Sequence, residues 1–304
     1  MDHGAFSAGF PMPVGHRQAA LPREAISLTT YAQLDLYLEK FAAGEFGLLL
    51  LLGRPGTGKS ESVRRALGLV PSVSNNGDRV EPDALYIEGH IQPYGLYRDL
   101  WEHWDQPVIL DDLDKLHADG NCVRLLKPLC NTERVKRITW LSNLTLNDHE
   151  VPPSFVTTSN VILIANEWRT VNPGVRALED RAIILHFDPP KAELHRRVAE
   201  WFDDADVYAF IERILPSVAE LSMRHYCKGS QLRHAGLPDW RSSLLQMVLS
   251  DPRMACIVAL QCESTLSSEQ ERVDRFVSAT GSSRATYYRM KAQLVRQTSL
   301  ANAD

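Results

Sequence analysis

The sequence lacks several features that would place it in other classes of protein. It has no run of eighteen consecutive apolar residues, the length that a membrane-spanning helix needs, and its first twenty residues have no apolar core of the signal-peptide type. The five cysteines are scattered without the spacing of a zinc site, so we expect reduced and mostly buried thiols. These observations predict a cytoplasmic protein without a membrane partner.

The chain also has little excess charge of either sign. Its 33 Lys and Arg residues against 38 Asp and Glu residues give a formal net charge of −5 over 304 residues. This balance excludes a globally basic nucleic-acid binder, although local basic patches remain compatible with it. A hydrophobic content of 44% is enough to build a sizeable core.

The most informative feature that is present is a phosphate-binding loop. The apolar stretch from Leu48 to Leu52 runs directly into the eight residues Gly53-Arg54-Pro55-Gly56-Thr57-Gly58-Lys59-Ser60, a complete G-x-x-x-x-G-K-S motif. In such a loop the backbone N–H groups surround phosphate oxygens, the lysine reaches the β and γ phosphates, and the serine hydroxyl binds Mg²⁺. The following residues, from Glu61, favour a helix whose N-terminus faces the anion. The motif predicts that Gly53 to Glu61 bind ATP and that Ser60 contacts Mg²⁺.

The apolar pattern around this loop predicts an α/β fold. Short apolar runs, with helical stretches between most of them, occur at Phe46–Leu52, Ala84–Glu88, Pro107–Leu110, Asn160–Ala165 and Ala182–Phe187. Strands that are apolar throughout are typical of a parallel sheet covered on both faces. An amphipathic helix at Thr29–Phe41 precedes the sheet, and the pattern is helical from residue 191 to about residue 260.

Two acidic residues end the third of these runs. Asp111 and Asp112 follow Val108–Leu110, and ligands of a parallel sheet bind at the carboxyl ends of its strands. We therefore expect both acids beside the phosphate loop, with Asp111 orienting the water shell of Mg²⁺ and Asp112 polarising the attacking water. Asp114 is the alternative to Asp112.

The order of these parts resembles the AAA+ ATPase family over roughly Glu24 to Arg241. The resemblance implies a polar sensor at Asn166 and an arginine finger at Arg181 that reaches the nucleotide of a neighbouring subunit, with Arg176 as the alternative finger. It also implies a homo-oligomer and a helical lid whose second sensor is Arg224, with Arg233 as the alternative. The family usually has Glu after the metal-binding Asp, whereas this chain has the shorter Asp112. We expect this difference to affect the rate of hydrolysis more than the binding of nucleotide.

Two of these residues also have purely structural interpretations. Asn166 ends a strand, where an asparagine often caps the following turn. Arg181 follows Asp180, with which it could form a surface ion pair.

The C-terminal segment resembles a helix-turn-helix. A helical pattern over Gln270–Thr280 is broken by Gly281-Ser282-Ser283 and resumes at Arg284. Gly281 suits the turn, and Ser282 or Ser283 suits the cap of the second helix. A second helix of this kind can enter the major groove of DNA. The candidate DNA contacts are Arg284, Thr286, Tyr288, Arg289 and Lys291. Val277 stands where the motif usually has Ala, and the alternative is a hairpin that packs on the lid or on a partner protein.

A second basic stretch runs from Arg134 to Trp140. Lys136, Arg137 and Trp140 could follow a nucleic-acid backbone and stack on it, or the stretch could be a solvated face. The proline-containing segment Thr145–Phe155 is interpreted as a loop insertion.

Four parts and one function follow from these patterns. Residues 1–23 are predicted to be a flexible arm, 24–190 the AAA+ nucleotide-binding core, 191–261 the lid, and 262–304 the helix-turn-helix-like tail. The predicted function is an ATPase that uses ATP and Mg²⁺ to drive assembly or remodelling on DNA, similar to helicase loaders and the ATPases of mobile elements. The alternative is a protein remodeller or chaperone whose C-terminal helices bind a protein partner.

Overall fold

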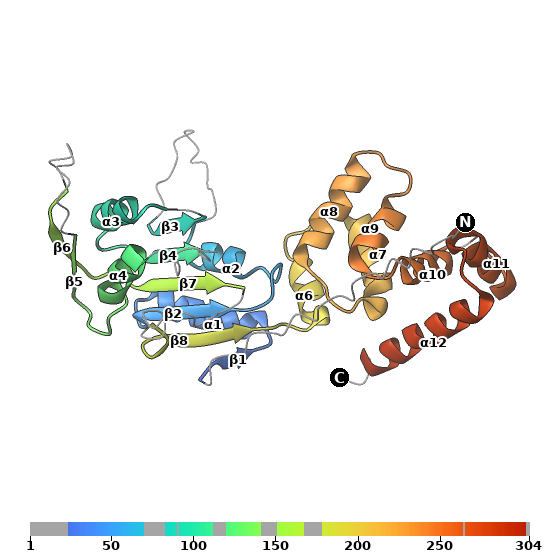
Figure 1. Ribbon diagram of the computed structural model, residues 1–304, viewed down its shortest axis with the longest axis horizontal. Coiled ribbons are helices and arrows are strands. Elements are labelled where there is room, and N and C mark those ends of the chain that lie inside the picture. The colour runs from blue at the N-terminus through green and yellow to red at the C-terminus, as the bar shows by residue number, and fades with distance from the viewer. Residues whose placement is uncertain are drawn as a thin grey trace, which may run out of the picture.

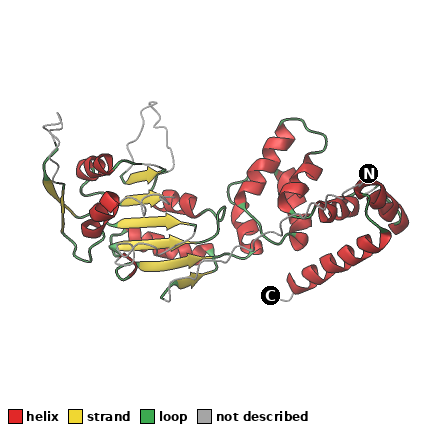
Figure 2. Cartoon of the chain, viewed as in Figure 1, coloured by secondary structure: helices red, strands yellow, loops and turns green. Residues whose placement is uncertain are grey.

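The computed structural model describes residues 24–69, 83–89, 91–111, 120–140, 151–166, 178–263 and 265–301. The predicted arm, residues 1–23, lies outside these ranges. Within them, the main sheet lies in one half of the molecule, and the other half is built of helices (Figures 1 and 2). The strand arrows of β2, β7 and β8 point toward the helical half, so the carboxyl edge of the sheet faces it (Figure 1).

The main sheet has six parallel strands in the order β1-β8-β2-β7-β4-β3. Their bounds are β1 Ile26–Leu28, β2 Leu48–Leu52, β3 Leu85–Glu88, β4 Val108–Asp111, β7 Val161–Ala165 and β8 Ile183–Phe187. The predicted fold class, an α/β P-loop core with a parallel sheet followed by helices, is confirmed. The edge strand β1 was not predicted, because three residues are too few to show a period.

Helices cover both faces of this sheet. Leu48, Leu50 and Leu52 of β2 belong to the buried cluster that includes α3 (Pro93–Glu102) and α4 (Gly120–Leu129). Leu49 and Leu51 belong to the cluster that includes α1 (Tyr31–Ala42) and α2 (Lys59–Ala66). Successive side chains of a strand point to opposite faces, so a strand between two helical layers is apolar at every position.

A separate antiparallel pair corrects the interpretation of the basic stretch. Strands β5 (Lys136–Thr139) and β6 (Ser154–Thr157) pair with each other, at the end of the core away from the helical half (Figure 1). The Lys136 side chain is buried, its Nζ donates to the Ser159 carbonyl at 2.7 Å, and burial lowers its pKa. The Trp140 ring packs near Tyr94 and Tyr97. Neither side chain is therefore free to contact nucleic acid, whereas Arg137 is exposed.

The helical half contains helices that share one buried cluster. They are α6 (Lys191–Val198), α7 (Ala205–Ile214), the 3-10 helix η1 (Leu215–Ser217), α8 (Met223–His234), α9 (Trp240–Val248), α10 (Pro252–Cys262), α11 (Glu269–Thr280) and α12 (Arg284–Ala301). The cluster extends from Leu194 of α6 to Leu294 of α12, and α12 contacts α10, α11 and η1. The last two helices are thus packed on the preceding ones. No helix in the described ranges combines the length and the apolar character needed to span a membrane.

The turn between α11 and α12 has the predicted chemistry. Gly281 ends α11 with φ +65°, a left-handed conformation that favours glycine, and its N–H donates to the Val277 carbonyl at 2.9 Å. The Ser283 hydroxyl accepts a hydrogen bond from the Thr286 N–H at 3.2 Å, so Ser283 rather than Ser282 caps α12.

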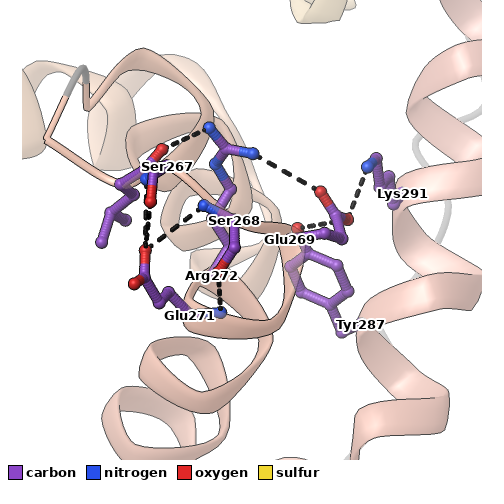
Figure 3. Close-up of polar contacts among 8 residues, drawn as sticks. Ser267, Ser268, Glu269, Glu271, Arg272, Tyr287 and Lys291 are labelled. Carbon is purple, nitrogen blue, oxygen red and sulfur yellow. Dashed lines mark hydrogen bonds and ion pairs between the residues drawn. The ribbon is translucent and has the colours of Figure 1, made fainter.

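An ionic network ties the start of α11 to the middle of α12 (Figure 3). The Glu269 carboxylate accepts hydrogen bonds from the Tyr287 hydroxyl at 3.0 Å and from Lys291 Nζ at 2.5 Å, and Arg272 lies 3.6 Å away. Ser268 and Glu271 form a capping box at the same helix end. The hydrogen bond from Lys291 is the main cause that holds the pKa of Glu269 below its ordinary value.

This network predicts a pH-dependent stability. Because the folded-state pKa of Glu269 is lowered, its ionised carboxylate adds to the free energy of unfolding at pH values above the ordinary pKa of 4.5. This stabilisation is lost as the pH falls through the folded-state pKa. We expect Glu269→Gln to lower the Tm by about 2 °C at pH 7, with the difference shrinking as the pH falls below the ordinary pKa of 4.5. Thermal unfolding followed by circular dichroism from pH 3 to pH 8 measures this. Glu220→Gln, an exposed glutamate outside the network, is the control, and equal Tm values of Glu269→Gln and wild type at pH 7 would contradict the prediction.

Candidate active site

The register of the parallel strands brings the predicted site residues to one edge of the sheet. Leu52 pairs with Ala165, and Asp111 pairs with Ile164, so β2, β7 and β4 end at nearly the same level. A pocket of about 500 Å³ lies at this edge. Among the predicted residues, it is lined by Gly56, Gly58, Lys59, Ser60, Glu61, Asp111, Asn166 and Arg224.

The phosphate loop is arranged around the ammonium group of Lys59. This buried side chain donates to the carbonyls of Gly53 at 2.7 Å and Arg54 at 2.9 Å, and to Asn166 Oδ1 at 3.2 Å. Gly58 caps α2 with φ +79°, and a Cβ added to it would lie 2.7 Å from Met223 Sδ. The left-handed backbone conformation therefore favours glycine at this position, and a larger residue would also displace the end of the Met223 side chain.

The other predicted loop residues support the loop rather than line the pocket. The Arg54 guanidinium is held by Asp188, with Nε 2.6 Å from Oδ1, and also donates to the Pro189 carbonyl at 3.2 Å. The buried Thr57 hydroxyl donates to the Arg54 carbonyl at 3.0 Å. Pro55 is exposed. The Arg54 side chain thus connects the loop to the end of β8, just before the helical half begins.

Two helices outside the sheet edge also hold the loop. The Met223 N–H at the start of α8 donates to the Gly56 carbonyl at 2.8 Å, and the Tyr31 hydroxyl of α1 donates to the Thr57 carbonyl at 2.7 Å. The Ser222 hydroxyl accepts from the Arg224 N–H at 3.2 Å and caps α8. Because the first turn of α8 touches the loop, Arg224 reaches the pocket.

Asp111 has a partner that the sequence did not identify. Asp111 is buried, and the Tyr86 hydroxyl of β3 donates a short hydrogen bond to its Oδ2. Burial, together with this bond, raises the pKa of the Tyr86 phenol. Mg²⁺ prefers oxygen ligands, and the Asp111 carboxylate and the Ser60 hydroxyl, which line one pocket, fit such an ion.

A further ion pair lies beside this bond. Arg64 of α2 places its guanidinium 4.4 Å from the centre of the Tyr86 ring and 3.1 Å from the Glu88 carboxylate. Arg64 and Glu88 line the same pocket as Asp111. The only sequence signal for Glu88 was its place at the end of an apolar run, the same place that Asp111 has on β4.

Other predicted residues lie away from the pocket or outside the described ranges. Asp112, Asp114 and Arg176 belong to the latter group. Arg181 is exposed before the start of β8, at the sheet edge opposite the carboxyl ends, and its Nη1 donates to the Lys127 carbonyl at 3.3 Å. Arg233 forms ion pairs with Asp204 and Asp206 and does not line this pocket.

The candidate DNA contacts lie on α12, far from the phosphate loop (Figure 1). Arg284 pairs with Asp274 at 2.7 Å, Lys291 pairs with Glu269, and the Thr286 hydroxyl lies 3.0 Å from that of Ser283. Tyr288 and Arg289 are exposed. Two of the three predicted cations are therefore engaged by carboxylates of α11.

Comparisons with known proteins give no sequence match and a structural match of low similarity. No family model and no curated protein matches the sequence. Among solved structures, the chain is similar to the complex of the BchI and BchD subunits of magnesium chelatase, reconstructed by single-particle cryo-electron microscopy at 7.5 Å. The identity is 13%, the TM-score is 0.35, and the match covers 68% of this chain and 86% of that one. A likeness at this level supports no conclusion about this chain.

The hydrogen bond between Tyr86 and Asp111 leads to a prediction about metal affinity. Tyr86→Phe removes the hydroxyl that orients the Asp111 carboxylate, and loss of such an outer-shell partner typically costs 10- to 100-fold in metal affinity. We expect the Mg²⁺ concentration that half-saturates nucleotide binding to rise about 10-fold in Tyr86→Phe. A Mg²⁺ titration of the binding of a fluorescent ATP analogue measures it.

Tyr97→Phe is the matched control. It removes a tyrosine hydroxyl that donates to the Pro152 carbonyl at 2.6 Å, outside the pocket. An equal Mg²⁺ requirement in Tyr86→Phe and wild type would show that the Tyr86 bond does not orient a metal ligand.

Proposed function

We propose that this chain is an ATPase of the AAA+ type. The observation that carries the proposal is the pocket in which Lys59 and Ser60 of the phosphate loop meet Asp111 of β4, Asn166 after β7 and Arg224 of α8. A cation, two oxygen ligands for a metal, a polar side chain and a lid arginine are the parts that phosphoryl transfer needs around a triphosphate.

The loop residues account for ATP binding. The N–H groups at the start of α2 suit an anion, and the Lys59 ammonium exchanges its bonds to the loop carbonyls for bonds to phosphate oxygens when ATP binds. When bound, Mg²⁺ neutralises phosphate charge, held by Ser60 and Asp111. Asn166, already in contact with Lys59, orients the γ phosphate or the attacking water. Asp112, which follows β4 directly, is the residue that the sequence predicts to polarise that water.

The position of Arg181 favours a site shared between subunits. Arg181 lies at the sheet edge opposite its own phosphate loop, so it does not reach the γ phosphate bound there. An exposed arginine at that edge suits contact with the nucleotide of a neighbouring copy, where it would neutralise charge on the transferring phosphoryl group. We therefore propose a homo-oligomer with Arg181 acting in trans.

Two inactive variants test ATP binding and the shared site together. Lys59→Ala should abolish ATP binding, because it removes the cation of the loop that lines the pocket. Arg181→Ala should bind ATP almost normally and lose about 10³-fold or more in turnover. A mixture of the two should recover part of the activity, because mixed interfaces pair an intact loop with an intact arginine. Phosphate release measures turnover, and light scattering establishes that Lys59→Ala still assembles.

Normal ATP affinity in Lys59→Ala would contradict the proposed nucleotide site. If the variants assemble together and the mixture is as inactive as its parts, Arg181 does not act in trans. Arg137→Ala, an exposed arginine of β5, is the control for removal of a surface cation.

We propose DNA as the surface on which this ATPase assembles, with α12 as the contacting helix. Tyr288, Arg289 and Arg296 are exposed on α12, and residues seven apart on a helix lie on the same face, about 10 Å from one another. These two arginines suit phosphate contacts, and Tyr288, the residue before Arg289, suits a sugar or base edge. Lys291 and Arg284 contribute less, because they already pair with Glu269 and Asp274.

A salt titration tests this assignment. Each phosphate contact contributes about −0.9 to the slope of log K against log salt concentration for duplex DNA. Arg289→Ala combined with Arg296→Ala should reduce the magnitude of that slope by about 1.8 and weaken binding about 10-fold or more at low salt. Arg284→Ala should have a smaller effect. Fluorescence anisotropy with a labelled duplex measures both quantities, and DNA binding that the double variant leaves unchanged would favour the alternative, a protein partner for the tail.

A further inference from the structure

Glu88 shares the carboxyl edge of the sheet with Asp111. Strands β3 and β4 pair in parallel with Glu88 opposite Asp111, so the two acids end neighbouring strands at the same level. Both residues line the pocket that contains Lys59, Ser60 and Asn166. A second carboxylate therefore lies beside the proposed metal ligand, on β3, a strand for which the sequence predicted no functional residue.

The Glu88 side chain lies on the same face of the sheet as the Asp111 side chain. Tyr86 precedes Glu88 by two residues and so points to the same face, and its hydroxyl reaches the Asp111 carboxylate. Arg64 of α2, the helix that covers this face, contacts both the Tyr86 ring and the Glu88 carboxylate. The ion pair with Arg64 holds the Glu88 carboxylate while 61% of its side chain stays exposed.

A carboxylate in a phosphate-binding pocket has an electrostatic cost. Two like charges about 4 Å apart repel by about 4 kcal/mol at an effective dielectric constant of 20. The cations of Arg64 and Lys59, which line the same pocket, offset this repulsion. The attacking water loses a proton during hydrolysis. A carboxylate at this position can accept that proton, which would give the electrostatic cost a function.

We propose that Glu88, in place of Asp112, is the catalytic residue that orients and deprotonates the water attacking the γ phosphate. This assignment rests on the proposed ATPase function. The water oxygen forms a bond to the γ phosphorus, the bond from that phosphorus to the β–γ bridging oxygen breaks, and ADP leaves with the electron pair. Glu88 accepts the proton of the water and passes it to phosphate or solvent. Arg64 is a positioning residue that holds the carboxylate.

The test separates catalysis from binding in Glu88→Gln, which keeps the shape and removes the basic oxygen. We expect kcat to fall about 100-fold, with the Kd for ATP and the half-saturating Mg²⁺ concentration within threefold of wild type. Glu45→Gln is the matched control, because Glu45 is also an exposed carboxylate paired with a cation, at 2.9 Å from Lys40. It should leave kcat unchanged. Circular dichroism establishes that both variants fold.

Three results would overturn the assignment. One is a kcat in Glu88→Gln within threefold of wild type. The second is a loss of Mg²⁺ affinity equal to that of Asp111→Asn, which would make Glu88 a metal ligand. The third is an equal loss of turnover in Glu45→Gln. A wild-type protein that binds ATP and never hydrolyses it would instead overturn the proposed ATPase function, and the assignment of Glu88 with it.

Discussion

Parallel pairing of β2, β7, β4 and β3 is the constraint on which the candidate site depends. Each pair is in register near its carboxyl end, where Leu52 lies opposite Ala165, Asp111 opposite Ile164, and Glu88 opposite Asp111. The loop, the sensor candidate and the two acids are far apart in the sequence, and this register alone brings them to one edge. A one-residue shift of β4 would turn Asp111 to the other face of the sheet.

The contacts around the phosphate loop connect the sheet to the helical half. Met223 at the start of α8, Tyr31 of α1 and Arg54 within the loop form hydrogen bonds that join the loop to three other parts of the chain. A change in the loop on nucleotide binding would therefore act directly on α8, which carries Arg224. The helices from α6 to α12 share one buried cluster, so packed side chains connect α8 to the tail.

Tertiary pairing also decides which charged residues are free to act. Lys136, Lys291 and Arg284 all stand in basic stretches of the sequence, but each is engaged by a carbonyl or a carboxylate. Conversely, no sequence motif surrounds Glu88. Its candidate role follows from its neighbours in space, which are Tyr86 on its own strand, Asp111 on β4 and Arg64 on α2. The charge pattern along the sequence therefore did not indicate which of these side chains are paired, because pairing depends on distance in space.

The sequence by itself determined the α/β core, five of the six parallel strands, the helices from α6 onward and the phosphate loop, because each depends on a local period or a contiguous motif. It also predicted Asp111, which ends an apolar strand, as a residue beside the loop, and the resemblance to the AAA+ family predicted Asn166. Only the tertiary structure showed the β5–β6 pair, the bond from Tyr86 to Asp111, the place of Glu88 and the burial of Lys136. These features arise between segments distant in the sequence, where the register of strands and the packing of helices, rather than local pattern, set which side chains meet.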